Sequence, residues 1–157
     1  RSLGINKVLW LQNPDTALIA IIFMSLWSMG GVMIIFLAGL NGIPEELYEA
    51  AKIDGANKLS SFRFVTLPLM TPVIFFNLVL QIISSFQVFT AGFLVTAGGP
   101  NYATNFYVLY LFNTAFTYFD MGYASALAWV LFFIVLLLSL VVFRSSSRWV
   151  HYEEAGG

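Results

Sequence analysis

The 22 residues GYASALAWVLFFIVLLLSLVVF, at positions 122–143, contain no aspartate, glutamate, lysine or arginine. Two further charge-free stretches precede them, 25 residues at 16–40 and 23 residues at 71–93. A helix needs about 20 apolar residues to cross a lipid hydrocarbon core, where backbone polar groups cannot stay unpaired. The pattern predicts an all-α membrane protein with three transmembrane helices in this chain.

The composition agrees with a membrane protein. Hydrophobic residues make up 59% of the 157 residues and charged residues only 10%, whereas soluble domains carry about 25% charged residues. The net charge of −1 gives no reason to expect nucleic acid as a partner. Cysteine is absent, so disulfides and cysteine-ligated metal sites are excluded. Because the chain begins at Arg1 without a signal-peptide pattern, we interpret it as a fragment whose N-terminal part is missing.

Lysine and arginine gather in two of the segments outside the expected spans. The loop 41–68 contains three, the tail 144–157 contains two, and the connection 94–121 contains none. The positive-inside rule then predicts a cytoplasmic loop and C-terminal tail, with the connection on the outer side. Arg1 and Lys7 would lie outside, as a mild exception.

The outer connection is expected to contain structure of its own. Gly98-Gly99-Pro100 is a strong turn signal, and residues 104–119 are aromatic and apolar at near-helical spacing. We predict a helix at or dipping into the outer interface. A fourth span is the alternative, but the segment is short, and a fourth crossing would place the basic tail outside.

The loop 41–68 predicts two short helices. Pro44 followed by Glu45 and Glu46 is typical of a helix start. One face of this helix holds two alanines that another protein could approach closely, and Gly55 is suited to end it with a positive φ. The members of that face are Leu47, Ala50, Ala51 and Asp54. A second helix is expected from Lys58 to Thr66, stopped by Leu67-Pro68.

The same loop carries a spaced motif. Glu49-Ala50-Ala51, three residues, Gly55, nine residues and Val65-Thr66-Leu67-Pro68 resemble the EAA motif of permeases in binding-protein-dependent ABC importers, with Val65 in place of the usual isoleucine. The resemblance implies the ABC permease fold, with a loop that docks in a cytoplasmic ATPase and transmits its closure. The residues implied to couple are Glu49, Ala50, Ala51, Asp54 and Gly55.

Further segments resemble the carbohydrate-importer permeases, and the tail 150–154 is similar to the maltose-F and glycerol-phosphate-A type. These segments are 10–14, 40–51, 53–56, 85–89, 96–100 and 121–126. The resemblance implies a second homologous permease, a cytoplasmic ABC ATPase dimer, an extracytoplasmic solute-binding protein and a place in a bacterial or archaeal inner membrane. It implies a transport subunit without a cofactor, in which a separate subunit hydrolyses ATP.

Polar side chains inside the expected spans are candidates for the solute path. Asn77, Gln81, Ser84 and Ser85 share one helical face, here called the polar face. Amides and hydroxyls suit sugar hydroxyls, which both donate and accept hydrogen bonds. The alternative is hydrogen bonding between helices. Asn77 is expected nearer the cytoplasm, where it lines the path or only packs.

The first span has weaker candidates near its middle. Ser28-Met29-Gly30-Gly31 predicts a kink or close helix packing. Family permeases place sugar contacts near this point, so Trp27 and Gly31 are included as path candidates, with packing the preferred reading.

The residues that other classes of membrane or enzyme function require are absent from the expected spans. The only histidine is His151, in the tail, and no GxxxxGK[ST] motif is present. An ion channel or ion-coupled carrier would usually place ionisable groups within its spans, and an intramembrane enzyme would need paired acids or a Ser–His pair. Sugar, oligosaccharide and glycerol phosphate all remain open as solutes, although the absence of intramembrane lysine and arginine favours an uncharged sugar.

Overall fold

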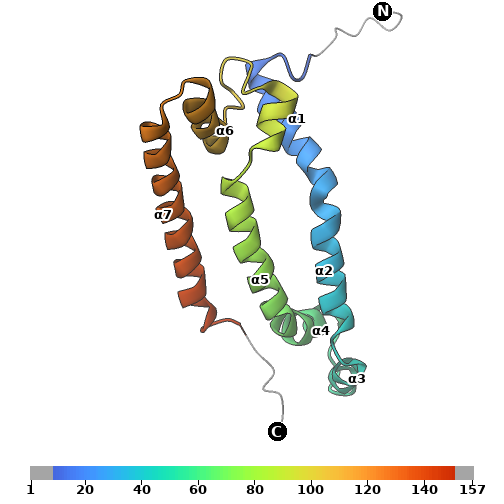
Figure 1. The fold of residues 1–157 in the computed structure, drawn as a ribbon. Coiled ribbons are helices and arrows are strands. Elements are labelled where there is room, and N and C mark those ends of the chain that lie inside the picture. The colour runs from blue at the N-terminus through green and yellow to red at the C-terminus, as the bar shows by residue number, and fades with distance from the viewer. Residues whose placement is uncertain (1–8, 151–157) are drawn as a thin grey trace, which may run out of the picture. The chain divides into compact units, whose positions relative to one another are not determined.

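The computed structural model describes residues 9–150 of the chain, and these residues form helices and turns without a β-strand (Figure 1). The chain divides into two compact units, one containing residues up to 28 and 84–134, the other 29–83 and 135 onward. In order, the elements are α1 Pro14–Leu26, a 3₁₀ turn Trp27–Met29, α2 Gly30–Asn41, α3 Glu45–Ile53, α4 Lys58–Ser61, a π turn Phe62–Thr66, α5 Leu67–Phe86, a π turn Gly92–Thr96, α6 Tyr107–Phe112, a π turn Asn113–Thr117 and α7 Met121–Ser146.

Three helical stretches within residues 9–150 are long and apolar enough to cross a membrane. They are Pro14–Asn41, Lys58–Phe86 and Met121–Ser146, of 28, 29 and 26 residues. None of the most apolar window of the third stretch is buried inside the chain, so its side chains need lipid or another protein around them. The prediction of an all-α protein with three candidate spans is confirmed.

The first span begins where the sequence provides a cap. The Asn13 side chain accepts a hydrogen bond from the Asp15 backbone N–H at 3.0 Å, and Pro14 occupies the first helical position. The 3₁₀ turn Trp27–Met29 interrupts the helix near its middle, which fits the predicted kink. Close packing at the paired glycines is not seen within the described chain, because a Cβ on Gly30 or Gly31 would meet nothing within 4 Å.

The second span differs from the prediction at its start. The helix expected to stop at Leu67-Pro68 instead continues, and the stretch from Lys58 to Phe86 is unbroken. A π turn precedes α5, and within it the Leu67 N–H bonds to the Phe62 carbonyl, five residues back. Proline lacks an N–H and crowds the preceding turn. The wide turn relieves this crowding, so Pro68 lies in the first turn of α5 without ending the helix.

The end of the second span was also predicted wrongly, at 93 instead of Phe86. Residues 87–89 are not helical and contain neither glycine nor proline, so no local signal marks the break. The next segment packs tightly instead. A Cβ on the buried Gly92 would lie 2.7 Å from Phe106 Cδ2 and 3.0 Å from the Thr104 carbonyl oxygen. Tertiary packing thus ends this helix before its apolar sequence does.

The connection between α5 and α7 contains the predicted turn and a shorter helix than expected. Gly98 has φ 84° at the predicted turn. The helical segment covers α6 and the following π turn, Tyr107 to Thr117, instead of 104–119. Thr104 is held in the turn, because its hydroxyl donates to the Gly99 carbonyl at 2.8 Å and also bonds the Thr96 hydroxyl.

Aromatic side chains hold each unit together. In one unit Phe89, Phe93, Phe112 and Phe116 form a cluster with ring centroids 5.0–5.5 Å apart. The Tyr107 hydroxyl in the same unit donates to the Leu127 carbonyl at 2.8 Å, which fixes α6 to α7.

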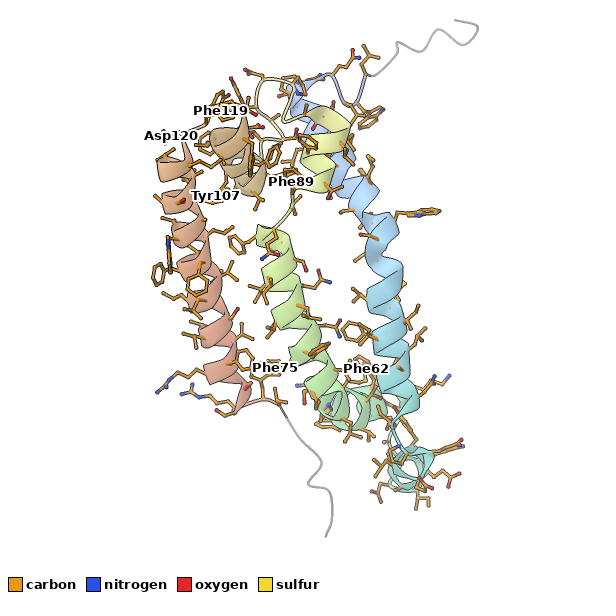
Figure 2. The ribbon with its side chains drawn as sticks, in the orientation of Figure 1. Phe62, Phe75, Phe89, Tyr107, Phe119 and Asp120 are labelled. Carbon is orange, nitrogen blue, oxygen red and sulfur yellow. The ribbon has the colours of Figure 1, made fainter. Side chains whose placement is uncertain are left out.

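In the other unit, the Phe75 ring meets Phe143 edge-on at 5.1 Å and Trp149 at 6.1 Å, so the end of α7 packs on α5 (Figure 2). The predicted tail start at 144 is helical, since α7 runs to Ser146. Residues 1–8 and 151–157 lie outside the described part, and with them Arg1, Lys7, His151 and most of the tail segment compared above.

Candidate functional site

The loop helix α3 begins and ends as its sequence predicts. Pro44 precedes it with φ −58° and ψ 134°, and Glu45 and Glu46 occupy its first turn. Carboxylates there favour the positive end of the helix dipole. Gly55 follows the helix with φ 80°, the left-handed conformation that favours glycine.

The turn at Gly55 is closed by two backbone hydrogen bonds. The Ala56 N–H bonds to the Ala51 carbonyl at 2.9 Å, and the Gly55 N–H bonds to the Lys52 carbonyl at 3.1 Å. This pair is the Schellman arrangement, which satisfies carbonyls that a helix end would otherwise leave open. The turn therefore has a defined geometry and directs the chain out of α3 at a fixed angle.

The candidate coupling residues lie on α3 or directly after it, in an open part of the loop. Glu49, Ala50 and Asp54 are exposed, and Ala51 is half-buried. A Cβ on Gly55 would meet no atom of residues 9–150 within 4 Å, so these residues leave this end of the loop uncovered. The small side chains of Ala50 and Ala51 leave the helix backbone accessible to a close neighbour.

A side-chain hydrogen bond, which the sequence did not predict, links α3 to the second span. The Tyr48 hydroxyl lies 2.9 Å from the Thr66 hydroxyl, and Thr66 is buried in the π turn that opens α5. A second polar contact orders the segment between them, because the Asn57 side chain accepts from the Ser60 N–H at 2.9 Å and caps α4. The loop helix is therefore attached to the second span through Thr66 as well as through the chain.

The four residues of the polar face do not behave alike. Gln81, Ser84 and Ser85 are exposed on α5. Asn77 is only 4% exposed, and its Nδ2 donates to the Val73 carbonyl of its own helix at 2.9 Å. Its amide is thus partly satisfied inside the helix, which favours packing over solute contact for Asn77.

The two candidates of the first span are both open. Trp27 lies in the 3₁₀ turn and is 95% exposed, and a Cβ on Gly31 would meet no atom of the described part of the chain within 4 Å. Trp27, Ser84 and Ser85 belong to one unit of the chain, and Gly31, Asn77 and Gln81 to the other.

The side chains of the candidate path residues are neutral amides, hydroxyls and an indole. Along residues 9–150 there is no group of three metal-ligating side chains. The polar face offers neutral amide and hydroxyl groups, which can both donate and accept hydrogen bonds.

Comparison with known proteins identifies close relatives. The chain is 54% identical, over 151 residues, to a probable ABC transporter permease protein, YesP, of Bacillus subtilis strain 168; the match covers 95% of this chain and 49% of the relative. It is 38% identical, over 90% of its length and 48% of the relative, to a trehalose/maltose transport system permease protein, MalF, of Thermococcus litoralis.

A third relative is a putative ABC transporter permease protein of Caldicellulosiruptor, 37% identical over 87% of this chain and 98% of the relative. The chain spans about half the length of the first two relatives. Residues 3–148 also match the family described as binding-protein-dependent transport system inner membrane component. With nearly all of its length matched, the chain belongs to this family of ABC transporter permeases.

Proposed function

We propose that the chain forms part of the membrane path of an ABC importer for a sugar or related polyol, and that α3 couples this path to a cytoplasmic ATPase. The observation that carries the proposal is the construction of the loop 41–68. An exposed Glu49-Ala50 surface, a fixed turn at Gly55 and the Tyr48–Thr66 bond connect a docking surface to a membrane-spanning helix.

The chain needs other subunits for this activity. A second homologous permease would cover the apolar surfaces that this chain leaves open, and an ABC ATPase dimer would bind the coupling residues and hydrolyse ATP. A solute-binding protein would deliver the solute on the outer side. The lysine and arginine pattern supports an inner-membrane protein with the loop 41–68 and the C-terminus in the cytoplasm.

The solute class follows from the neutral polar face and from the relatives. One of the relatives described above is a trehalose/maltose transport system permease protein. No lysine or arginine lies on α5 between Leu67 and Phe86 to hold a phosphate, so an uncharged sugar is favoured. Glycerol phosphate is the alternative, for which another part of the transporter would have to supply a cation.

Uptake by the assembled transporter tests the proposal. The full-length permease, its permease partner, the ATPase and the binding protein are reconstituted in liposomes. Entry of radiolabelled neutral sugars and of glycerol 3-phosphate is then measured with ATP or a non-hydrolysable analogue. We expect uptake of a neutral sugar that needs hydrolysis. Equal uptake of the sugar with ATP and with the non-hydrolysable analogue would instead indicate a channel or carrier.

A further inference from the structure

A small cavity lies in the connection between α5 and α7. Its volume is about 270 Å³, and every residue that lines it belongs to the unit containing residues 84–134. Its walls are three tyrosines and two asparagines, with Ala97 and Gly98 at the turn. The five polar residues are Tyr102, Tyr110, Tyr118, Asn105 and Asn113.

The Asn105 amide in the cavity wall has an unused acceptor. Its Oδ1 is buried and has no hydrogen-bond partner in the described structure, although buried polar atoms are nearly always paired. Gly98 leaves space beside this amide, since a Cβ there would lie 3.6 Å from Oδ1. The terminal torsion of asparagine is broad, and this acceptor would gain a hydrogen bond by turning toward a donor in the cavity.

Unusual backbone conformations gather at the same place. Ala97 has φ 50°, Gly98 84° and Tyr102 62°. Positive φ is uncommon for alanine and an outlier for tyrosine, and such residues cluster at ligand-binding sites. At Tyr102 this backbone leaves the side chain 78% exposed at the edge of the cavity.

The lining defines the chemistry of a ligand. It contains no lysine, arginine, histidine, aspartate or glutamate, so neither an anion nor a cation would find a countercharge. Tyrosine hydroxyls and asparagine amides both donate and accept hydrogen bonds, and tyrosine rings offer apolar faces. A neutral, hydroxyl-rich ring matches this combination. The volume is near the lower limit of about 300 Å³ for ligand pockets, which suits one sugar unit better than an oligosaccharide.

We propose that this cavity is a peripheral binding site for a single neutral sugar unit, separate from the polar face of α5. The inference rests on the proposed function, because the connection 94–121 lies on the outer side in that topology. A solute arriving there would meet this cavity before it entered the membrane path.

Sugar binding to the whole transporter tests the cavity directly. 3-Fluorotyrosine is placed at Tyr118, and its ¹⁹F signal is followed in nanodiscs without ATP or binding protein. Glucose, galactose, mannose, xylose and arabinose are the probes, with cyclohexanol and glucose 6-phosphate as comparisons. We expect a saturable shift with at least one neutral sugar and none with the comparison compounds. Asn105→Ala should weaken this binding about 2- to 10-fold, the effect of one lost hydrogen bond.

Two controls make the outcome specific. Gln87→Ala removes an exposed amide of the same unit outside the cavity and should leave the shift unchanged, and Asn105→Ala should not lower the thermal midpoint. A shift absent with all five sugars, or equal for cyclohexanol, or unchanged in Asn105→Ala, would overturn the proposal. ATP-driven sugar uptake by the same preparation tests the transport function independently. If uptake is normal but the ¹⁹F signal does not shift, only the proposed cavity site is contradicted.

Discussion

The Tyr48 hydroxyl lies 2.9 Å from the Thr66 hydroxyl, although the two residues are 18 positions apart in the chain. Tyr48 lies in the middle of α3, and Thr66 ends the π turn from which α5 begins. The bond therefore joins the proposed docking helix to the second span, directly before α5, by a route other than the backbone. It predicts that loosening this contact separates ATP hydrolysis from transport.

Tyr48→Phe removes the hydroxyl and keeps the ring. The lost bond should cost about 0.5–1.5 kcal/mol, and we expect more ATP to be hydrolysed for each sugar imported. Thr66→Val should have the same effect, and the double variant should add little, because both changes break one bond. The control is Tyr107→Phe, which removes the bond to the Leu127 carbonyl in the other unit. An unchanged ratio in Tyr48→Phe would show that the contact plays no part in coupling.

Gly55 allows a test of backbone conformation alone. Its φ is 80° and a Cβ would meet nothing within 4 Å, so a substitution adds strain without a clash. Gly55→Val should cost on the order of 1–3 kcal/mol locally and reduce both ATPase co-purification and solute-stimulated hydrolysis. Gly55→Asn is the matched control, because asparagine tolerates this conformation. If Gly55→Asn loses as much ATPase binding and stimulated hydrolysis as Gly55→Val, the cause is the presence of any side chain at this position and not the backbone conformation. Normal activity in Gly55→Val would exclude the turn as a coupling element.

Glu49→Lys tests the exposed docking surface. Reversing this charge on α3 should leave the membrane helices inserted, since insertion depends on their apolar length, while binding of the ATPase falls. Co-purification of the ATPase with the permease is the measurement. Glu45→Lys, at the first residue of the same helix, is the control, because it changes the charge of the helix by the same amount. Retained ATPase and normal transport in Glu49→Lys would remove this residue from the docking surface.

The polar face predicts a transport defect without a folding defect. Gln81→Leu or Ser85→Leu should raise the KM for uptake while assembly and basal hydrolysis are kept, because hydrogen bonds between membrane helices average only about 0.6 kcal/mol. Val79→Leu, about half a helical turn from Gln81, is the control for added bulk. If neither Gln81→Leu nor Ser85→Leu changes the KM for uptake, the polar face serves helix packing and not solute binding.

At Gly39 the first span lies close against the second span within their unit. A Cβ there would lie 2.9 Å from Val73 Cγ2 and 3.1 Å from the Met70 sulfur. Gly39→Val should lower stability by about 1–3 kcal/mol through overpacking, measured as a fall in the thermal midpoint in detergent. Gly30→Ala meets no atom within 4 Å in this chain and should be tolerated. An equal fall in Gly30→Ala would show that another subunit covers that face.

How much the sequence predicts depends on the range of the interaction. Charge-free stretches are enough to predict three spans, and Gly55 is enough to predict the turn after α3. The two wrong boundaries have causes of different range: the π turn before Pro68 is local, whereas the contact of Gly92 with Phe106 joins residues 14 positions apart. The helix passes Pro68 because a π turn opens before it, and it ends at Phe86 where the next segment packs Gly92 against Phe106. Neither the wide turn nor the contact leaves a local pattern in the residues.

In the candidate site, too, local sequence patterns predict some features, whereas contacts between separate segments cannot be predicted from them. Periodicity places Asn77 and Gln81 on one face, but it cannot tell that the Asn77 amide bonds to the Val73 carbonyl. The Tyr48–Thr66 bond and the cavity beside Asn105 join residues from separate segments, so they appear only once the chain is folded.

The unbroken helix from Lys58 to Phe86 has a mechanical consequence. Within one unit it extends from Lys58 to Ile83, about 39 Å at 1.5 Å per residue. A helix of that length that tilts as one body by about 5° moves its far end by about 3 Å, although the π turn Phe62–Thr66 and Pro72 within it are positions where helices bend. A helix that stopped at Pro68 would absorb the same tilt in a joint. Proline normally ends a helix, but Pro68 lies inside this continuous helix, so a movement of its first turns can reach the part in the membrane.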